Sequence, residues 1–358
     1  MSGRARRVLV VAGGTRATAS TRHRLWNYRP FLEREGVELD WIEYTGGRLE
    51  SAAAALSARL RFLWELGRRA GERDVILVQK VLPPIPLVRR WRRAGARVVY
   101  DFDDALYERF EWGETEVQAA QRKRRFDAML AAASHVTTGS PPLADYARGL
   151  NAAVDVFYPS LERARFDALP ARRTGGGPVI GWVGNDQSQI YLKALEPVLA
   201  DVMARHPGAR LRVCSSRLPD LPTLPADRVE LVPWSEAGEL AAVASFDVAV
   251  SPLASDKWSQ ARGGRVSVLL SLAAGVPVVA APGGGLEELA KGDPRGQAEP
   301  GLQFARGADE WRARLDGLLS DPGERERRGR AARALIDSSI WADVQWPRFR
   351  AVIFGERP

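Results

Sequence analysis

Apolar and polar positions follow two alternating patterns along the chain. Short runs of consecutive apolar residues, many of them β-branched, are separated by longer segments in which apolar residues recur every three or four positions. Short runs bounded by turn residues are typical of buried strands in parallel sheets. They cover residues 7–12, 38–43, 74–79, 97–100, 134–139 and 154–158, and then 179–183, 210–215, 229–233, 246–250, 276–281 and 301–304. Because the intervening segments predict helices, we expect an α/β protein.

The pattern is interrupted at 161–178, a segment that ends in the glycine-rich sequence TGGGP and that we interpret as a linker. At 358 residues the chain is too long for one ordinary core. We therefore predict two doubly wound, Rossmann-like parallel-sheet domains, the first over 1–160 and the second over 179–340.

Residues 51–69 predict a single amphipathic helix. Its apolar positions are three or four residues apart, as on one side of a helix. They are Leu56, Leu60, Leu63, Trp64 and Gly67. We expect this side to face the core.

The stretch 256–288 predicts a loop, a helix, a tight turn, a buried strand and a glycine loop. Its helix is opened by Arg262, Gly263, Gly264 and Arg265 and is ended by Gly275. A helix N-terminus offers unpaired amides and a positive dipole end, which together with arginines favour a phosphate group. The alternative is an ordinary helix–strand unit with two surface arginines.

Three carboxylates follow the predicted strand 97–100. They are Asp101, Asp103 and Asp104 in the sequence DFDD. Acids gathered at the carboxyl end of a strand repel one another, so folding alone does not require them. They could bind hydroxyl groups, act as a base or hold Mg²⁺. The alternative is a helix N-cap with acids in its first turn.

A second polar group follows the first strand. Ser20 or Thr21 could cap a helix that runs to Gly36, and Arg22, His23 and Arg24 lie just inside it. Arginines in a first turn oppose the helix dipole, so we predict that this group binds an acceptor or a phosphate. Solvated arginines beside a helix cap are the alternative. The sequence lacks the GxGxxG pattern of dinucleotide sites.

Composition narrows the possible chemistry. One cysteine, Cys214, and three histidines exclude a disulfide framework and a metal centre built from these residues. We expect Cys214 to be a core residue. No apolar run is long enough to span a bilayer, and the first apolar run predicts a strand rather than a signal segment, so we expect a cytoplasmic protein.

The net charge of +8 could attract anionic lipid, nucleic acid or anionic substrates. No nucleic-acid-binding motif accompanies it, so we expect no nucleic-acid partner. The basic segment before Gly95 could contact anionic lipid, although a solvated helix face is the commoner explanation. Its arginines are Arg89, Arg90, Arg92 and Arg93.

Several of these segments resemble family-4 glycosyltransferases of the GT-B fold. The sequence LAAGVPVVA at 272–280 is similar to the family's donor-site motif. The motifs STRHR, DFDDA, GWVG, PWSE and DKWSQARGG precede AAGVPVV in the family's order, and they span nearly the whole chain.

The resemblance implies two domains that face each other across a cleft, with a helix at 341–358 returning to the first domain. It implies a retaining, metal-independent transfer of sugar from a nucleotide-sugar donor to a glycan, lipid-linked or small-molecule acceptor, without a cofactor. A peripheral contact with the inner membrane face stays an alternative. The three aspartates would orient substrate hydroxyls. The donor would lie in the second domain, against Gly184, Asn185, Lys193, Lys257 and the Arg262–Arg265 turn.

In one respect the sequence departs from the family. The family places two glutamates eight positions apart near its donor-site motif, and here those positions hold Arg262 and Leu270. This departure keeps open a GT-B-like binding or partner protein that has lost its chemistry. A sugar-nucleotide epimerase of the same fold is the third hypothesis, although its usual carboxylate and histidine pattern is not seen.

Overall fold

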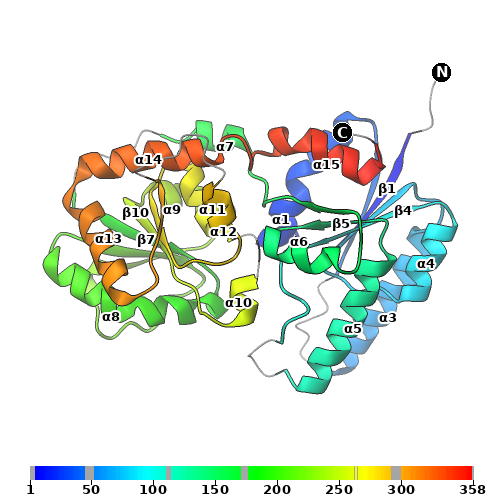
Figure 1. Ribbon diagram of the computed structural model, residues 1–358, viewed down its shortest axis with the longest axis horizontal. Helices are drawn as coiled ribbons and strands as arrows, with labels where there is room; N and C mark the ends of the chain where they lie inside the picture. The colour runs from blue at the N-terminus through cyan, green and yellow to red at the C-terminus, as the bar shows by residue number, and fades with distance from the viewer. Residues whose placement is uncertain are drawn as a thin grey trace. The chain divides into compact units, whose positions relative to one another are not determined.

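The computed structural model describes residues 5–44, 52–109, 114–170, 176–261, 263, 265–291 and 300–356. The chain divides into two compact units (Figure 1). The first unit comprises Met1–Leu161, Ala261–Gly264 and Ala342–Pro358, and the second comprises Glu162–Gln260 and Arg265–Trp341. Each unit is described by itself below.

The first unit is built on a six-stranded sheet in the order β2-β1-β3-β4-β5-β6, and every neighbouring pair is parallel. The strands are β1 (Arg7–Ala12), β2 (Glu38–Glu43), β3 (Val75–Gln79), β4 (Arg97–Phe102), β5 (His135–Thr138) and β6 (Val154–Val156). Their bounds lie close to the predicted ones, because continuous β-branched runs buried on both faces leave little freedom in placing a strand. One difference matters for the site, since β4 extends through Asp101.

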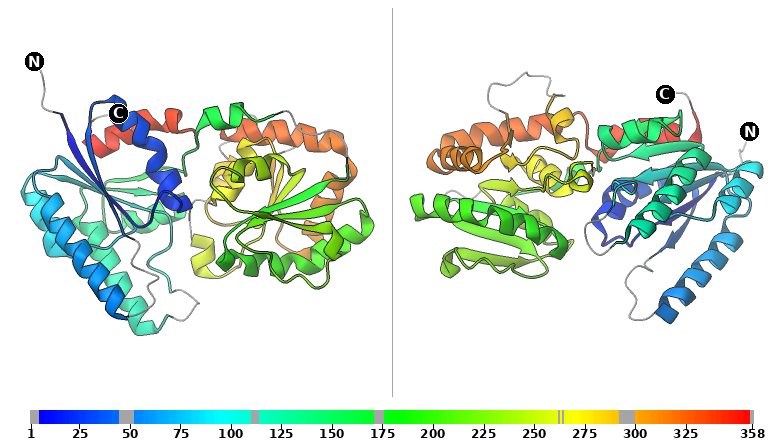
Figure 2. Two further views of the ribbon diagram at one scale, coloured as in Figure 1. Left: turned by 180° about the vertical axis from the view of Figure 1, so that it is seen from behind. Right: turned by 60° about the horizontal axis from the view of Figure 1, so that its bottom comes forward.

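Helices cover both faces of this sheet. They are α1 (Ala19–Arg24), α2 (Arg29–Arg34), α3 (Ala52–Arg69), α4 (Ile85–Arg93), α5 (Glu116–Ala132), α6 (Pro141–Arg148) and α15 (Ala342–Phe354), with a 3₁₀ turn η1 (Trp26–Tyr28). Figures 1 and 2 show α15 beside α1 on one face and α3 with α5 on the other. Tyr28 stacks on Phe349 of α15, with ring centroids 4.2 Å apart.

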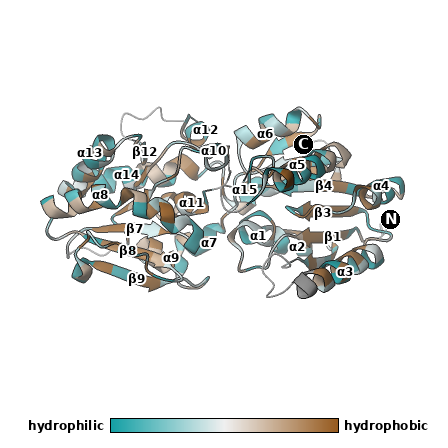
Figure 3. Ribbon diagram, turned by 90° about the horizontal axis from the view of Figure 1, so that it is seen from below, coloured by the Kyte–Doolittle hydropathy of each residue, from teal (hydrophilic) through white to brown (hydrophobic). Residues whose placement is uncertain are grey.

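The second unit repeats this architecture with the order β12-β11-β10-β7-β8-β9, again wholly parallel. Its strands are β7 (Val179–Val183), β8 (Arg210–Ser215), β9 (Val229–Pro233), β10 (Val248–Ser251), β11 (Val278–Ala280) and β12 (Leu302–Phe304). The predicted fold class, with two doubly wound parallel sheets, is confirmed. Figure 3 shows the strands of both sheets as mostly hydrophobic, as layers covered on both faces require.

The helices of the second unit include one inside the predicted linker. They are α7 (Arg163–Asp167), α8 (Gln189–Arg205), α9 (Glu239–Ala244), α10 (Lys257–Ala261), α11 (Val266–Ala273), α12 (Leu286–Lys291), α13 (Ala308–Ser320) and α14 (Pro322–Ile336), with 3₁₀ turns η2 (Asp186–Ser188) and η3 (Ala226–Arg228). Gly275 ends α11 in a left-handed conformation with φ of 69°, and Cys214 is fully buried, both as expected. None of the helices in the described ranges combines the length and apolar content of a membrane span.

Two local predictions were wrong. The helix predicted from Ser20 to Gly36 is divided into α1, η1 and α2, and Thr18 rather than Ser20 or Thr21 precedes its first turn. In α3 the predicted core-facing side faces outward, because Leu56, Leu60 and Trp64 are exposed while Phe62 and Leu66 are buried. The helix has two apolar stripes, and the sheet takes the one that the prediction passed over.

Candidate functional site

The strand order of each sheet defines where a ligand is expected. In open α/β sheets, ligands bind outside the carboxyl ends of the strands where the order reverses. In the first unit the reversal lies between β1 and β3. The loops after these strands approach closely, since a Cβ added at Gly13 would lie 3.0 Å from the carbonyl oxygen of Gln79.

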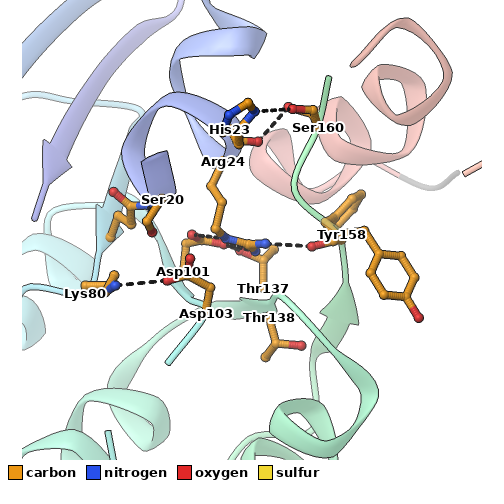
Figure 4. A network of polar contacts seen from close by, with 12 residues as sticks. Ser20, His23, Arg24, Lys80, Asp101, Asp103, Thr137, Thr138, Tyr158 and Ser160 are labelled. Carbon is orange, nitrogen blue, oxygen red and sulfur yellow. Dashed lines mark hydrogen bonds and ion pairs between the residues drawn. The ribbon is translucent and has the colours of Figure 1, made fainter. Parts of the chain in front are cut away.

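A buried ion pair lies beside this point, in the next strand of the sheet. Nε of Arg24 donates to Oδ2 of Asp101 at 2.7 Å, and Nη2 donates to Oδ1 (Figure 4). Thr137, the β5 residue paired with Asp101, donates its hydroxyl to Oδ1 at 2.6 Å. Both charged side chains are no more than 2% exposed. Burial by itself lowers the pKa of Arg24, but the charge and hydrogen bonds of Asp101, together with the charge of Asp103, outweigh it and the pKa is raised.

The two residues before Arg24 are also inside the unit. Nδ1 of His23 lies 2.9 Å from the carbonyl oxygen of Ser160, and the amide of Ser160 donates to the His23 carbonyl at 2.7 Å. Nε of Arg22 donates to Nε2 of His23 at 3.3 Å. All three members of the predicted acceptor or phosphate group are buried, so the alternative of solvated arginines is wrong.

A second polar cluster lies directly at the reversal point. Nζ of Lys80, the residue after β3, forms an ion pair with Asp103 at 3.1 Å (Figure 4). It also forms an ion pair with Asp104. Burial by itself raises the pKa of Asp103, but Lys80 and then Arg24 outweigh it, so the pKa lies below its usual range. Burial likewise opposes the charge on Lys80, yet the two carboxylates raise its pKa.

Lys80 is held in an unfavourable backbone conformation, with φ of 59°. A non-glycine residue in this region costs on the order of 1–3 kcal/mol and persists where its surroundings fix it. No helix begins at Asp103 or Asp104, because residues 103–109 form an irregular loop with one turn, so the capping alternative for DFDD is wrong. Lys80 was missed from sequence, although a single cation directly after the buried run DVILVQ is a usable signal.

Ser140 is a further polar residue at this edge, after β5. It is fully buried, and no hydrogen-bond partner for its Oγ occurs among the residues that the structure describes. The neighbouring Gly139 is closely surrounded, because an added Cβ would lie 3.0 Å from Cβ of Asp103 and 3.4 Å from Nη1 of Arg24. Asp103 and Arg24 therefore pack closely against Gly139, the residue before Ser140.

In the second unit the strand order reverses between β7 and β10. Gly184 follows β7, and a Cβ there would lie 2.4 Å from the Trp182 ring and 2.5 Å from Oγ of Ser188. Asn185 caps η2 by accepting from the amide of Ser188 at 2.9 Å. Lys193 is exposed one turn into α8. The glycine loop thus lies at the reversal point of this sheet.

The basic turn before α11 is only partly described. Arg265 is buried and donates to the carbonyl of Ala281 at 2.6 Å, to Oγ of Ser251 at 2.6 Å and to the Ser251 carbonyl. Its φ of 22° is again unfavourable. Arg265 therefore ties together the ends of β10 and β11, so the alternative of a surface arginine is wrong for this residue. Arg262 and Gly264 lie outside the described residues.

The other two predicted donor residues have different surroundings. The amide of Gly263, which belongs to the first unit, donates to the carbonyl of Asp103 at 2.9 Å. Lys257 is exposed at the first position of α10. Leu270, at one of the positions where the resembled family has glutamate, is buried in α11.

A glycine loop after β11 completes this edge. Gly283, Gly284 and Gly285 all have positive φ, between 68° and 109°. The amide of Gly283 donates to both carboxylate oxygens of Glu287, at 3.0 Å and 2.9 Å. Glu287 was not predicted, although its place four residues after Gly283 is visible in the sequence. Within the described ranges, no group of three or more potential metal-ligating side chains is present.

Comparison with known proteins agrees with this geometry. Residues 177–321 match the family model described as Glycosyl transferases group 1. Residues 177–321 therefore form a glycosyltransferase domain. The matched segment covers both strands at the reversal point of the second unit and the whole of the basic turn. No curated protein shows a significant match to the chain.

Solved structures support the fold over the full length of the chain. Sucrose-phosphate synthase from Thermosynechococcus elongatus has a TM-score of 0.67 at 15% identity, covering 98% of this chain and 99% of that chain. A glycosyltransferase from Rickettsia africae has a TM-score of 0.68 at 11% identity, covering 98% of both chains. HepE from Anabaena, solved with UDP and glucose, has a TM-score of 0.64 at 13% identity, covering 96% and 99%. The fold is the GT-B fold that the resemblance implied.

Proposed function

We propose that this glycosyltransferase takes sugar from a nucleoside-diphosphate sugar bound by its second unit and transfers it to an acceptor hydroxyl, with retention of configuration and without a metal ion. The observation that carries the proposal is the reversal point between β7 and β10, which falls inside the matched family segment. HepE was solved with UDP and glucose, which supports a nucleoside-diphosphate sugar as the donor.

The donor diphosphate gains charge as it leaves, so its stabilisation is the main electrostatic task of the site. Exposed Lys193 and Lys257 are long cations that can approach a diphosphate from this edge of the unit. Arg265 has a different role in the proposal. Because it donates to the ends of β10 and β11, it positions the start of α11.

In the first unit we assign the acceptor side to Asp103. Lys80 and Arg24 keep its carboxylate ionised, so it can accept a hydrogen bond from a sugar hydroxyl. Asp101 has no such freedom, since Arg24 and Thr137 occupy both of its oxygens. Asp101 is thus a positioning residue in this proposal, while Asp104 shares Lys80 with Asp103.

The test begins with a mass-spectrometric screen of nucleotide sugars bound by the purified protein, followed by titration of the best donor. Lys257→Met and Lys193→Met should raise the donor dissociation constant about tenfold or more, as for loss of a charged contact. Lys291→Met is the matched control, because Lys291 is also exposed and lies at the end of α12. Failure of the folded protein to bind any nucleotide sugar would contradict the proposal.

The stereochemical and metal parts need their own measurements. Proton NMR of the first product formed should show the anomeric configuration of the donor. Turnover should be unchanged by EDTA. An inverted product would exclude retention, and activity that EDTA abolishes and Mg²⁺ restores would exclude the metal-independent mechanism.

A further inference from the structure

The outer side of α3 carries an apolar stripe that is not covered by any residue described in its unit. Leu56, Leu60 and Trp64 are 58%, 58% and 63% exposed. Their spacing of four residues places them one above another, over about 12 Å of helix. Large apolar side chains occur singly on most surfaces, whereas a contiguous stripe marks a surface that contacts something.

The opposite side of α3 holds the helix against its sheet. Phe62 and Leu66 are buried, and Phe62 contacts Tyr44 just after β2, with ring centroids 4.5 Å apart. Arg69 donates to the carbonyl of Trp41 in β2 at 2.9 Å. Figure 2 shows α3 as a long helix at the periphery of the first unit. The exposed stripe is therefore separate from the contacts that fold the unit.

The charges beside the stripe have one sign. Arg59 and Arg61 lie about 100° to either side of Leu60, since each residue turns the helix by that angle. Arg68 places its guanidinium 5.1 Å from the Trp64 ring centroid. All three arginines are exposed. Among the side chains described at 56–69, the one acid is Glu65, which is half-buried and paired with Arg69 at 3.4 Å.

We propose that α3 docks this glycosyltransferase on an anionic lipid surface, with its apolar stripe in the interface and its arginines at the phosphate groups. An apolar face bordered by cations, with a tryptophan among its members, is the pattern of helices that lie in the plane of a membrane interface. A second copy of the chain fits less well. Two such faces in contact would bring arginines together with no exposed acid between them.

The arrangement of charge distinguishes α3 from a merely basic surface. Helix α4 exposes Arg89, Arg90, Arg92 and Arg93, but its apolar residues Val88 and Trp91 are buried, and Ile85 and Leu87 are partly buried. Electrostatic attraction by α4 could bring the protein near anionic lipid. Of these two helices, α3 is the one with a stripe of exposed large apolar side chains that can insert into the lipid. Vesicle binding by α3 should thus depend on both kinds of residue.

The experiment is co-sedimentation of the full chain with phosphatidylcholine vesicles and with vesicles that contain about a third phosphatidylglycerol. The protein should bind the anionic vesicles, and added salt should weaken binding. The variant Leu56→Ser/Leu60→Ser/Trp64→Ser should lower the partition coefficient about tenfold or more. Val117→Ser/Ile190→Ser is the matched control, because these residues are 66% and 54% exposed on other helices.

Charge is tested separately. Replacing Arg59, Arg61 and Arg68 by Gln should reduce binding about fivefold for each arginine. The matched control replaces three exposed arginines of the second unit, Arg217, Arg306 and Arg330, by Gln. Since every substituted residue is at the surface, circular dichroism should confirm that the variants fold.

A fluorescent label reports insertion directly. Leu60→Cys can be labelled selectively because Cys214, the one natural cysteine, is fully buried. The emission of an environment-sensitive dye at position 60 should shift to the blue with anionic vesicles. Unchanged binding by the serine variant, or equal binding to neutral vesicles, would overturn the proposal. So would a change from dimer to monomer in the serine variant without any vesicle binding. None of these measurements uses a sugar donor, so the result is independent of the proposed transfer reaction.

Discussion

Arg24 and Asp101 form a two-point ion pair in which each side chain is almost completely removed from solvent. The pair joins α1 to β4, and the Thr137 hydroxyl extends it to β5. A buried charge is tolerated only when its partner and its hydrogen bonds are in place. The site of the first unit is therefore built on an interaction whose two halves depend on each other.

Replacing one member of this ion pair should therefore lower the free energy of unfolding more than replacing both members. We expect Arg24→Met or Asp101→Asn to lower the free energy of unfolding of the first unit by about 3–5 kcal/mol. The double variant Arg24→Met/Asp101→Leu should recover part of that loss. Chemical denaturation of the single and double variants measures the coupling. Additive losses in this cycle would mean that the two side chains do not act as a pair.

Lys80 should control the acid stability of the site. The pKa of Asp103 is depressed in the folded protein, so its ionisation stabilises the fold at neutral pH. This contribution is lost as the pH falls through the folded pKa. Lys80→Met removes the nearest cation, so the acid unfolding midpoint should move to higher pH.

Lys80→Arg is the control, because it keeps the charge and should keep most of the acid stability. In the Lys80→Met/Asp103→Asn background the pH dependence assigned to Asp103 should disappear. A Lys80→Met profile that coincides with that of the parent protein would show that Lys80 does not set the protonation of Asp103.

Gly184 should be intolerant of a side chain for reasons of space. An added Cβ would lie 2.4 Å from the Trp182 ring and 2.5 Å from Oγ of Ser188, and both distances are shorter than van der Waals contact. Gly184→Ala should therefore destabilise the protein by about 1–3 kcal/mol. Gly317→Ala is the contrasting variant. Gly317 lies inside α13 with no atom within 4 Å of an added Cβ, so alanine there should stabilise the protein by about 1 kcal/mol. Thermal unfolding of both variants tests the packing.

The end of the first sheet provides a prediction about pH. A hydrogen bond from His135, followed by the contacts of Arg348, lowers the pKa of Asp155 to about 2. Ionised Asp155 therefore stabilises the fold above its unfolded pKa of about 4, and this contribution is lost progressively between about pH 5 and pH 1. Asp155→Asn should lower the free energy of unfolding at pH 7 by about 1 kcal/mol, allowing for solvent screening. The difference between the two proteins should vanish at about pH 1, below both pKa values, and a difference that persists there would have another cause.

Much of the fold was predictable because strands buried on both faces are written in the sequence as continuous β-branched runs. The runs at 7–12, 179–183 and 210–215 begin and end at the predicted residues. Helix α3 is an element whose orientation the sequence pattern does not predict. Phe62 and Leu66 have the same four-residue spacing as Leu60 and Trp64, so periodicity predicts a helix with two apolar sides and does not say which side the sheet covers.

The candidate site, like the fold, has features that the sequence predicts and features that depend on the tertiary structure. The sequence by itself determined the strands, the glycines that follow them and the aspartates of DFDD, because these depend on local backbone geometry and burial. Only the tertiary structure decided that Lys80 lies between Asp103 and Asp104, that Arg24 neutralises Asp101 and that Arg265 joins two strand ends. Each of these contacts joins residues between 14 and 77 positions apart, and it is the order of strands in the sheet that brings them together.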